Sequence, residues 1–261
     1  MRGTDMRELV RAMGLVRAMG MTVALWLAAT AAQARETVEF NASDELLVTA
    51  DVYELATGAK GAWIVLAHQA GASRGEYRDI APELNALGYN AIAIDQRSGK
   101  SFGGVFNETA QRAKEAETKA DYLDAIPDIA AGIAYARAQG ATKVILWGSS
   151  YSAALALAIA GENPDLVDAV VAMSPGEYLK GLSVTEASGK ITAPVLMVSP
   201  PDEKNRWEAM LAAVPHDQKT GFAPDTGGVH GSSALIEGFS PNPEPHWAVV
   251  KAFLARYAPP K

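Results

Sequence analysis

Residues 143–157 constrain the fold more than any other part of the chain. The apolar run at residues 144–147 leads through the small-residue segment 148–152 into an Ala/Leu-rich stretch. This pattern predicts a buried strand, a sharp turn and a helix. In a strand–turn–helix with Gly-x-Ser-x-small spacing, the middle serine takes a strained backbone conformation that raises its hydroxyl above the sheet. Ser150 is therefore the candidate nucleophile, with an ordinary tight turn as the alternative interpretation.

Composition sets limits on the function. The chain has 261 residues, of which 49% are hydrophobic, and this is enough for a single α/β domain with a substantial core. Its formal net charge of -7 and pI near 5.2 argue against a nucleic-acid partner, because phosphate binding needs clustered Lys and Arg. The chain has no cysteine, which excludes disulfides, thiolate metal sites and a cysteine nucleophile.

The N-terminus is typical of a secretory signal peptide. Several arginines precede the apolar residues 21–29, and Ala32 and Ala34 provide the small residues that signal peptidase requires. The apolar run is too short to span a membrane. We therefore expect a signal peptide over residues 1–34, a single domain over residues 35–261, and a secreted, periplasmic protein without a membrane span after processing. An uncleaved anchor is the alternative.

The remainder of the chain alternates strands and helices, which predicts a mostly parallel sheet with helices on both faces. Residues 37–40 and 46–53 alternate like an antiparallel hairpin. The other expected strands are residues 62–67, 91–94, 144–147, 169–173, 194–198 and 220–223, and the expected helices are residues 77–87, 122–139, 151–157, 207–214 and 246–257. Residues 102–119 are expected to form a loop over the site.

Four motifs in this order resemble the α/β-hydrolase superfamily. They are residues 66–71 (LAHQAG), residues 95–101 (DQRSGKS), residues 148–152 (GSSYS) and residues 227–231 (GGVHG). The segment around residues 69–77 is most similar to the dienelactone-hydrolase-like branch, although those enzymes often carry a cysteine nucleophile and this chain has serine. The resemblance implies an α/β-hydrolase fold, and the short connection over residues 174–192 leaves no room for a large cap domain.

A serine nucleophile needs a base to remove its proton. The chain offers only His68, His216, His230 and His246. The family order places the base in a loop after the last strand, which selects His230 within its run of glycines. His216 is then a surface-loop residue and His246 a helix-start residue. His68 is expected to pack behind the oxyanion loop and hold its shape by hydrogen bonding.

The third member of the triad is a carboxylate that orients the histidine. The segment after the strand at residues 194–198 offers Asp202 and Glu203. The family register favours Glu203, whereas aspartate is the commoner residue type at this position. Either residue could instead begin the next helix, where negative charge suits the helix dipole.

Backbone N–H groups are expected to stabilise the oxyanion that forms during attack. The resemblance implies the N–H groups of Tyr151, which follows the nucleophile, and of Ala70 in the loop after the strand at residues 62–67. Gln69 replaces the usual glycine of that loop and either lines the pocket or braces the loop. Arg97 is a candidate substrate-binding residue, with a salt bridge as the alternative role.

Together these features predict a serine hydrolase that cleaves small esters or related acyl compounds through an acyl-enzyme intermediate. An amidase or peptidase on the same triad and a catalytically silent binding protein are the alternatives. The scattered histidines predict no metal site, and Gly103-Gly104 lacks the context of a phosphate loop, so no cofactor is expected. The expected partner is a small acyl substrate, and the sequence leaves the oligomeric state open.

Overall fold

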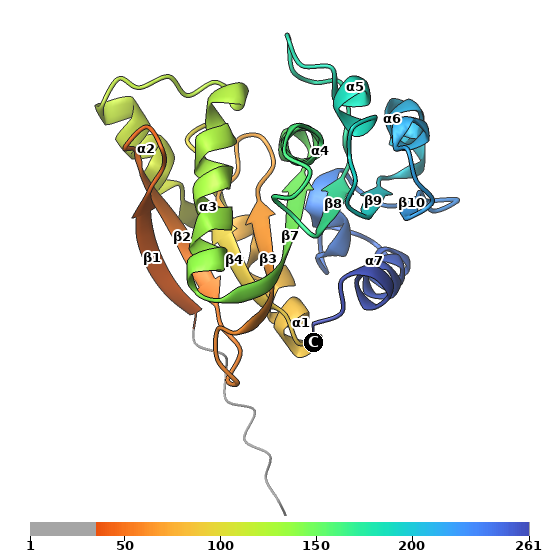
Figure 1. Cartoon of the computed structure of the whole chain (residues 1–261), viewed down its shortest axis with the longest axis horizontal. Coiled ribbons are helices and arrows are strands. Elements are labelled where there is room, and N and C mark those ends of the chain that lie inside the picture. Colours follow the sequence, from red (N-terminus) through yellow and green to blue (C-terminus); the bar gives the residue numbers. More distant parts are fainter. Residues whose placement is uncertain (1–34, 261) are drawn as a thin grey trace, which may run out of the picture. The chain divides into compact units, whose positions relative to one another are not determined.

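The computed structural model describes residues 35–260, and within them eight strands form one sheet (Figure 1). The strand order is β1-β2-β4-β3-β7-β8-β9-β10. The strands are β1 (Arg35–Asn41), β2 (Leu47–Tyr53), β3 (Gly61–Ala67), β4 (Asn90–Ile94), β7 (Ala141–Ser149), β8 (Ala169–Met173), β9 (Val195–Val198) and β10 (Lys219–Phe222). A separate two-stranded sheet pairs β5 (Ser101–Phe102) with β6 (Val105–Phe106).

The helical segments connect these strands. The α-helices are α1 (Ile80–Ala86), α2 (Glu108–Glu115), α3 (Ile126–Ala138), α4 (Tyr151–Glu162), α5 (Val184–Ser188), α6 (Glu208–Ala213) and α7 (Glu244–Tyr257). The 3-10 turns are η1 (Arg74–Tyr77), η2 (Tyr122–Ala125), η3 (Pro201–Arg206) and η4 (Gly231–Leu235).

The large sheet is mostly parallel. Strand β2 runs antiparallel to both of its neighbours, β1 and β4, and every other adjacent pair is parallel. The predicted hairpin at the start of the domain is present, with Arg35 opposite Tyr53 and Asn41 opposite Leu47. The prediction of a mostly parallel sheet with an antiparallel edge is confirmed.

The core has two halves, one on each face of the sheet. Alternate residues of β3 point to opposite sides: Trp63 and Val65 belong to the half that includes α3 and α4, whereas Ile64 and Leu66 belong to the half that includes α1 and α7. All four side chains are fully buried. Such continuous apolar strands are expected where helices cover both faces of a parallel sheet.

Two predicted helices differ in detail. The helix expected over residues 77–87 begins only at Ile80, as α1, because Tyr77 ends the preceding 3-10 turn η1. Ser73 caps η1, and the Tyr77 hydroxyl donates to the Ala67 carbonyl at the end of β3. The helix expected over residues 122–139 begins as η2 and becomes α-helical at Ile126, next to Pro127. The segment 102–119, expected as a loop, contains β6 and α2, and the Asn107 side chain caps α2.

The predicted signal peptide, residues 1–34, lies outside the described residues. Among residues 35–260, the structure contains no helix with the length and apolar character needed to cross a membrane.

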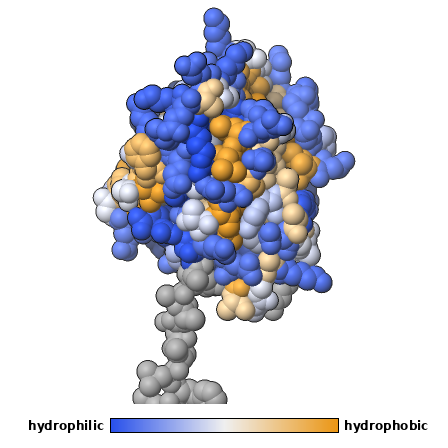
Figure 2. Space-filling view, turned by 90° about the vertical axis from the view of Figure 1, so that its left-hand side faces the viewer, coloured by the Kyte–Doolittle hydropathy of each residue, from blue (hydrophilic) through white to orange (hydrophobic). Residues whose placement is uncertain are grey.

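Strand β1 lies at the edge of the sheet. Figure 2 views the molecule from this side and shows a mainly hydrophilic surface with a strip of hydrophobic residues in its middle. Phe40 of β1 stacks on Tyr135 of α3, with ring centroids 5.1 Å apart, whereas Glu36 and Glu39 are exposed. Charged side chains on an edge strand oppose pairing with another chain.

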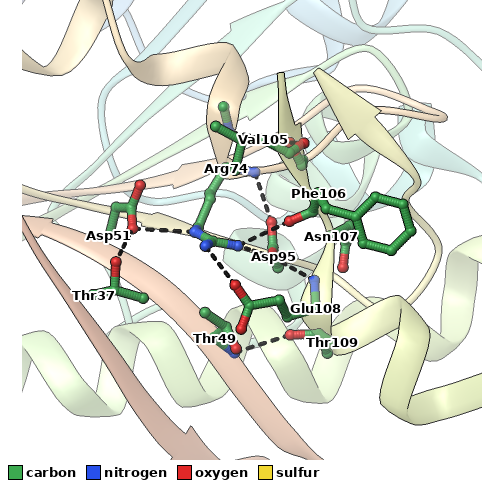
Figure 3. A network of polar contacts seen from close by, with 12 residues as sticks. Thr37, Thr49, Asp51, Arg74, Asp95, Val105, Phe106, Asn107, Glu108 and Thr109 are labelled. Atoms are coloured by element: carbon green, nitrogen blue, oxygen red, sulfur yellow. Dashed lines mark hydrogen bonds and ion pairs between the residues drawn. The ribbon is translucent and has the colours of Figure 1, made fainter. Parts of the chain in front are cut away.

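A buried arginine joins the loop around β5 and β6 to the main sheet (Figure 3). The Arg74 guanidinium donates to Asp51 of β2 at 3.1 Å, to Asp95 after β4, and to Glu108 of α2 at 2.8 Å. It also donates to the Phe106 carbonyl at 3.0 Å. Asp51 and Asp95 are almost fully buried, so Arg74 provides the positive charge that both carboxylates need.

We expect Arg74→Met to lower the free energy of unfolding by about 3–5 kcal/mol, because it leaves the buried Asp95 without a cation and leaves Asp51 only the partly exposed Arg35, 3.5 Å away. Urea unfolding followed by circular dichroism measures this change. The control is Arg137→Met, which removes a half-exposed pair with Asp168 and should cost less than about 1 kcal/mol. Equal losses in the two variants would contradict a special role for Arg74.

Candidate active site

Ser150 occupies the sharp turn between β7 and α4. Its backbone has φ 59° and ψ -119°, a left-handed conformation that costs a non-glycine residue roughly 1–3 kcal/mol. The Ser150 N–H donates to the Met173 carbonyl of β8 at 2.8 Å, which helps to hold the turn. A Cβ on Gly148 would lie 2.1 Å from the Ser152 carbonyl oxygen, so only glycine permits this close approach of strand and helix.

Ser152 occupies the position where the motif usually has its last glycine, and its side chain forms hydrogen bonds there. The Ser152 hydroxyl donates to the His68 carbonyl at 2.6 Å and accepts from the Gln96 amide at 2.5 Å. Gln96 also accepts from the His68 N–H and donates to the Tyr151 hydroxyl. These bonds tie the start of α4 to the end of β3, the neighbour of β7 in the sheet, and to the end of β4, the next strand beyond β3.

His230 lies in the loop between β10 and η4, with its ring against Ser150. Its Nε2 is 2.7 Å from the Ser150 hydroxyl oxygen. Gly228 and Gly231 on either side have positive φ angles, and a Cβ on Gly231 would lie 2.5 Å from the Ser149 hydroxyl oxygen. The glycine run therefore allows the loop to approach the turn closely enough for the imidazole to reach the serine.

Glu203 is the carboxylate that contacts His230. Its two oxygens lie 2.7 and 2.9 Å from the His230 Nδ1, and the side chain is almost fully buried. Burial alone would raise the pKa of Glu203, but hydrogen bonds from His230 and Ser174 and the nearby Arg206 charge lower it below its ordinary value. Asp202 is exposed, and its carboxylate makes no contact with His230 among the described residues.

Ser174 is a site residue that sequence reasoning did not identify. It follows β8 with a φ of 54°, and its hydroxyl oxygen accepts a 2.9 Å hydrogen bond from the Gly231 N–H. It also stabilises the Glu203 carboxylate. Ser174 thus connects the loop that carries the acid to the loop that carries the histidine. A positive φ at a serine leaves no recognisable pattern in a single sequence, so Ser174 could not be identified from it.

The two expected oxyanion donors belong to different segments, the start of α4 and the loop after β3. Tyr151 is the first residue of α4, so its N–H has no partner within the helix. Ala70 is exposed in the loop after β3, and its N–H has no recorded acceptor within residues 35–260. Gln69 braces the loop: its side-chain amide donates to the Ser233 hydroxyl at 3.3 Å.

A buried carboxylate, Glu76, lies directly behind these loops and was missed as a functional residue. Its two oxygens accept from the Gln69 N–H and from the Ser149 hydroxyl, both at 2.7 Å. The Ser149 oxygen in turn accepts from the Ser232 N–H at 2.9 Å. One carboxyl group therefore links the oxyanion loop, the nucleophile turn and the histidine loop. The segment around residues 69–77 contributed to the family resemblance, but a glutamate at a short 3-10 turn looks like a surface residue in the sequence, so no role was predicted for Glu76.

Arg97 does not line the site, which corrects the prediction that it binds substrate. Its guanidinium donates to Asp128 of α3 at 2.7–3.1 Å and to Asp44 at 2.5 and 2.9 Å. The side chain is 2% exposed. The structure supports the alternative role of Arg97 in a salt bridge. This salt bridge is buried, and Arg97 provides the cation that the Asp128 carboxylate in α3 needs.

The other histidines lie apart from the Ser150–His230 pair. His68 is fully buried: its Nδ1 is 2.9 Å from the Gln69 carbonyl, and its Nε2 accepts from the Gln96 N–H. Burial lowers the pKa of His68 to about 4, so its ring is neutral and holds the oxyanion loop as expected. His246 lies at the start of α7. Within residues 35–260, no group of three or more His, Asp or Glu residues has an arrangement suited to a metal ion.

Comparison with known proteins adds family information to this geometry. A family model described as serine aminopeptidase, S33, matches residues 58–218. These residues include the oxyanion loop, the nucleophile turn and Glu203, while His230 lies just beyond the matched region. No curated protein matches the sequence.

Solved structures share the fold at low sequence identity. A dienelactone hydrolase from Anabaena variabilis superposes with a TM-score of 0.66 at 18% identity, over 86% of this chain and 98% of the other. An esterase from Pyrococcus furiosus gives 0.64 at 18% identity, over 86% and 93%. An acylaminoacyl peptidase from Pyrococcus horikoshii gives 0.64 at 16% identity, over 86% of this chain and 42% of that longer chain. The α/β-hydrolase fold, without a large cap domain, is therefore confirmed.

We expect Glu76→Gln to change how stability depends on pH. Burial raises the pKa of Glu76 to about 7, so the folded protein keeps a proton that the unfolded chain releases near pH 4.5. The stabilisation from Glu76 is therefore complete below about pH 4.5 and is lost as the pH rises through about 7, an effect on the order of 3 kcal/mol at most. The wild type should lose more thermal stability than the variant between pH 5 and 8.

Thermal unfolding at four pH values across this range tests the prediction. The matched control is Glu162→Gln, which makes the same chemical change at an exposed position paired with Lys190. Parallel pH profiles for the wild type and Glu76→Gln would contradict titration of Glu76 in the folded protein.

Proposed function

This chain belongs to the serine aminopeptidase family, S33, and we propose that it is a serine hydrolase that cleaves small carboxylic esters through an acyl-enzyme intermediate. The observation that carries the proposal is the continuous line of hydrogen bonds from Ser150 through His230 to Glu203. These are the contacts that a serine nucleophile, its base and the orienting acid require.

In the first half-reaction, the Ser150 oxygen attacks the ester carbonyl carbon while the His230 Nε2 takes the hydroxyl proton. The carbonyl π electrons move to the oxygen, which becomes an oxyanion. When this tetrahedral intermediate collapses, the bond to the alcohol oxygen breaks, and His230 returns its proton to the departing alkoxide. The products are the acyl-enzyme and a neutral alcohol.

The second half-reaction repeats these steps with water. His230 removes a proton from a water molecule, whose oxygen attacks the acyl carbon, and the Ser150 oxygen leaves and regains the proton. The carboxylic acid is released and the enzyme returns to its starting state. Four proton transfers through one imidazole, two in each half-reaction, thus account for the whole cycle.

Glu203 supports both steps through its charge. Its lowered pKa keeps it ionised at neutral pH, so it accepts from the His230 Nδ1 and stabilises the imidazolium that forms on the other side of the ring. The N–H groups of Ala70 and Tyr151 are the proposed donors to the oxyanion. Each donor of this type typically contributes about 3–4 kcal/mol to lowering the barrier.

A second candidate is an amidase or peptidase that uses the same three residues. The family description and the structural similarity to an acylaminoacyl peptidase favour it. The triad chemistry is common to esters and amides, so the substrate pocket decides between them. A silent binding protein is less consistent with the site, because binding alone requires neither the 2.7 Å contact of His230 with Ser150 nor its contact with Glu203.

We expect the protein to react with a fluorophosphonate probe and to hydrolyse p-nitrophenyl acetate or butyrate. Intact mass should show one adduct on the wild type and none on Ser150→Ala, and turnover should be lost in Ser150→Ala and His230→Ala. A p-nitroanilide of the same acyl group measures amidase activity in parallel. A well-folded wild type without labelling or turnover would exclude the serine-hydrolase proposal.

We expect Glu203→Gln to lower kcat by roughly 10²- to 10⁴-fold with little change in KM, because an amide cannot hold the imidazole in its reactive tautomer or stabilise its charge. Asp202→Asn is the matched control one residue away, and its kcat should stay within about twofold of the wild type. The reverse pattern would assign the acid to Asp202.

A further inference from the structure

A groove beside Ser150 and His230 collects exposed hydrophobic side chains. It has a volume of about 490 Å³ and lies between η2 and the loop that follows β8. Of the six large hydrophobic side chains exposed among residues 35–260, three line this groove: Tyr122, Leu123 and Tyr178. A fourth, Ile126, lies at the start of the adjoining helix α3. Exposed apolar surface gathered in a groove is typical of a ligand site.

Tyr122 forms the wall of the groove next to the nucleophile turn. Its ring packs on Tyr151, the residue after Ser150, with centroids 4.5 Å apart and planes tilted by 39°. The Tyr151 hydroxyl lies 2.8 Å from the Ser98 hydroxyl and accepts from Gln96 at 2.9 Å, so this ring is fixed from below. Tyr122 therefore rests on a rigid support, with 42% of its surface exposed.

Tyr178 forms the opposite wall, next to the base. Its ring meets the His230 ring edge-on, with centroids 6.5 Å apart. Its hydroxyl donates to the Ser174 carbonyl at 2.9 Å, and a Cβ on Gly176 would lie 2.6 Å from the ring. Both aromatic walls are thus held in place before a ligand arrives, which reduces the entropy cost of binding.

The rim of the groove carries no net charge. Two lysines and two aspartates line it, and the aspartates are Asp121 and Asp124. The side chains of these two aspartates accept from each other's backbone N–H groups in a capping box. A neutral ligand suits this rim better than an anionic one. The volume is well above the roughly 150 Å³ that holds a benzene molecule, so a ring and its ester group fit.

We propose that this groove binds a neutral aromatic ring of the substrate, so that the preferred substrates are aryl esters. The inference rests on the proposed function and adds the substrate class. Aromatic rings pack well against other rings in offset or edge-on geometry, and Tyr122 and Tyr178 present such rings on either side of the groove. The ring can belong to the acyl half or to the alcohol half of the ester.

Three small esters distinguish these possibilities. Methyl cinnamate carries the ring on the acyl half, phenyl acetate carries it on the alcohol half, and ethyl butyrate has no ring. Release of acid in a pH-stat gives kcat and KM for each with the wild type and Tyr122→Ala. We expect Tyr122→Ala to raise KM by roughly threefold to tenfold for one aryl ester, with ethyl butyrate unchanged within twofold.

Matched variants separate ring binding from damage to the site. Tyr122→Phe keeps the ring and should retain the wild-type KM. Phe239→Ala removes an exposed ring (55% against 42% for Tyr122) that stacks on Phe102 and should change none of the three esters. If Tyr122→Ala does not fold, Leu123→Ser tests the same groove with a smaller effect in the same direction.

The possible outcomes are distinct. A wild type that hydrolyses ethyl butyrate while Tyr122→Ala alters all three esters equally, or none, would overturn the aryl-ester inference and leave the proposed function standing. A wild type that neither hydrolyses any ester nor reacts with a fluorophosphonate would overturn the proposed function itself. A rise in KM limited to methyl cinnamate would assign the ring to the acyl half, and one limited to phenyl acetate to the alcohol half.

Discussion

The close approach of β7 and α4 at Gly148 is the constraint on which the rest of the site depends. The absence of a Cβ at Gly148 lets the first turn of α4 come within contact of the strand, and the chain between them must then pass through the left-handed conformation of Ser150. Such strain persists only when the surroundings hold it. Here the sheet supplies the support, because Ser150 bonds to β8 and Ser152 bonds to the end of β3.

The loops around Ser150 are held together by buried polar groups rather than by regular secondary structure. Glu76 joins the oxyanion loop to the nucleophile turn, and Ser174 joins the histidine loop to the loop of the acid. Arg74 does the same for the segment after β5 by neutralising carboxylates from two strands. Buried polar groups and buried charges are costly without partners, so they favour one arrangement of the loops over others.

The sequence predicted some features of the fold better than others, depending on whether the feature leaves a local pattern in the chain. Apolar runs predicted the strands closely, since residues buried on both faces of a parallel sheet are hydrophobic throughout, as in β8. Helix starts were less predictable. The turn at residues 74–77 depends on a Tyr77 hydrogen bond to a distant strand end, and Arg97 was taken for a substrate ligand because nothing local shows Asp128 and Asp44 converging on it.

By itself the sequence determined the strand–turn–helix at Ser150, the α/β class and the order of the candidate nucleophile, acid and histidine, because these depend on local periodicity and on residue types in chain order. Only the tertiary structure shows that Glu203 and not Asp202 contacts His230, since the Glu203 side chain turns inward and Asp202 is exposed. It also placed Glu76 and Ser174 beside the candidate site and formed the groove at Tyr122. Each of these depends on contacts between segments far apart in the chain, which a single sequence does not encode in any local pattern.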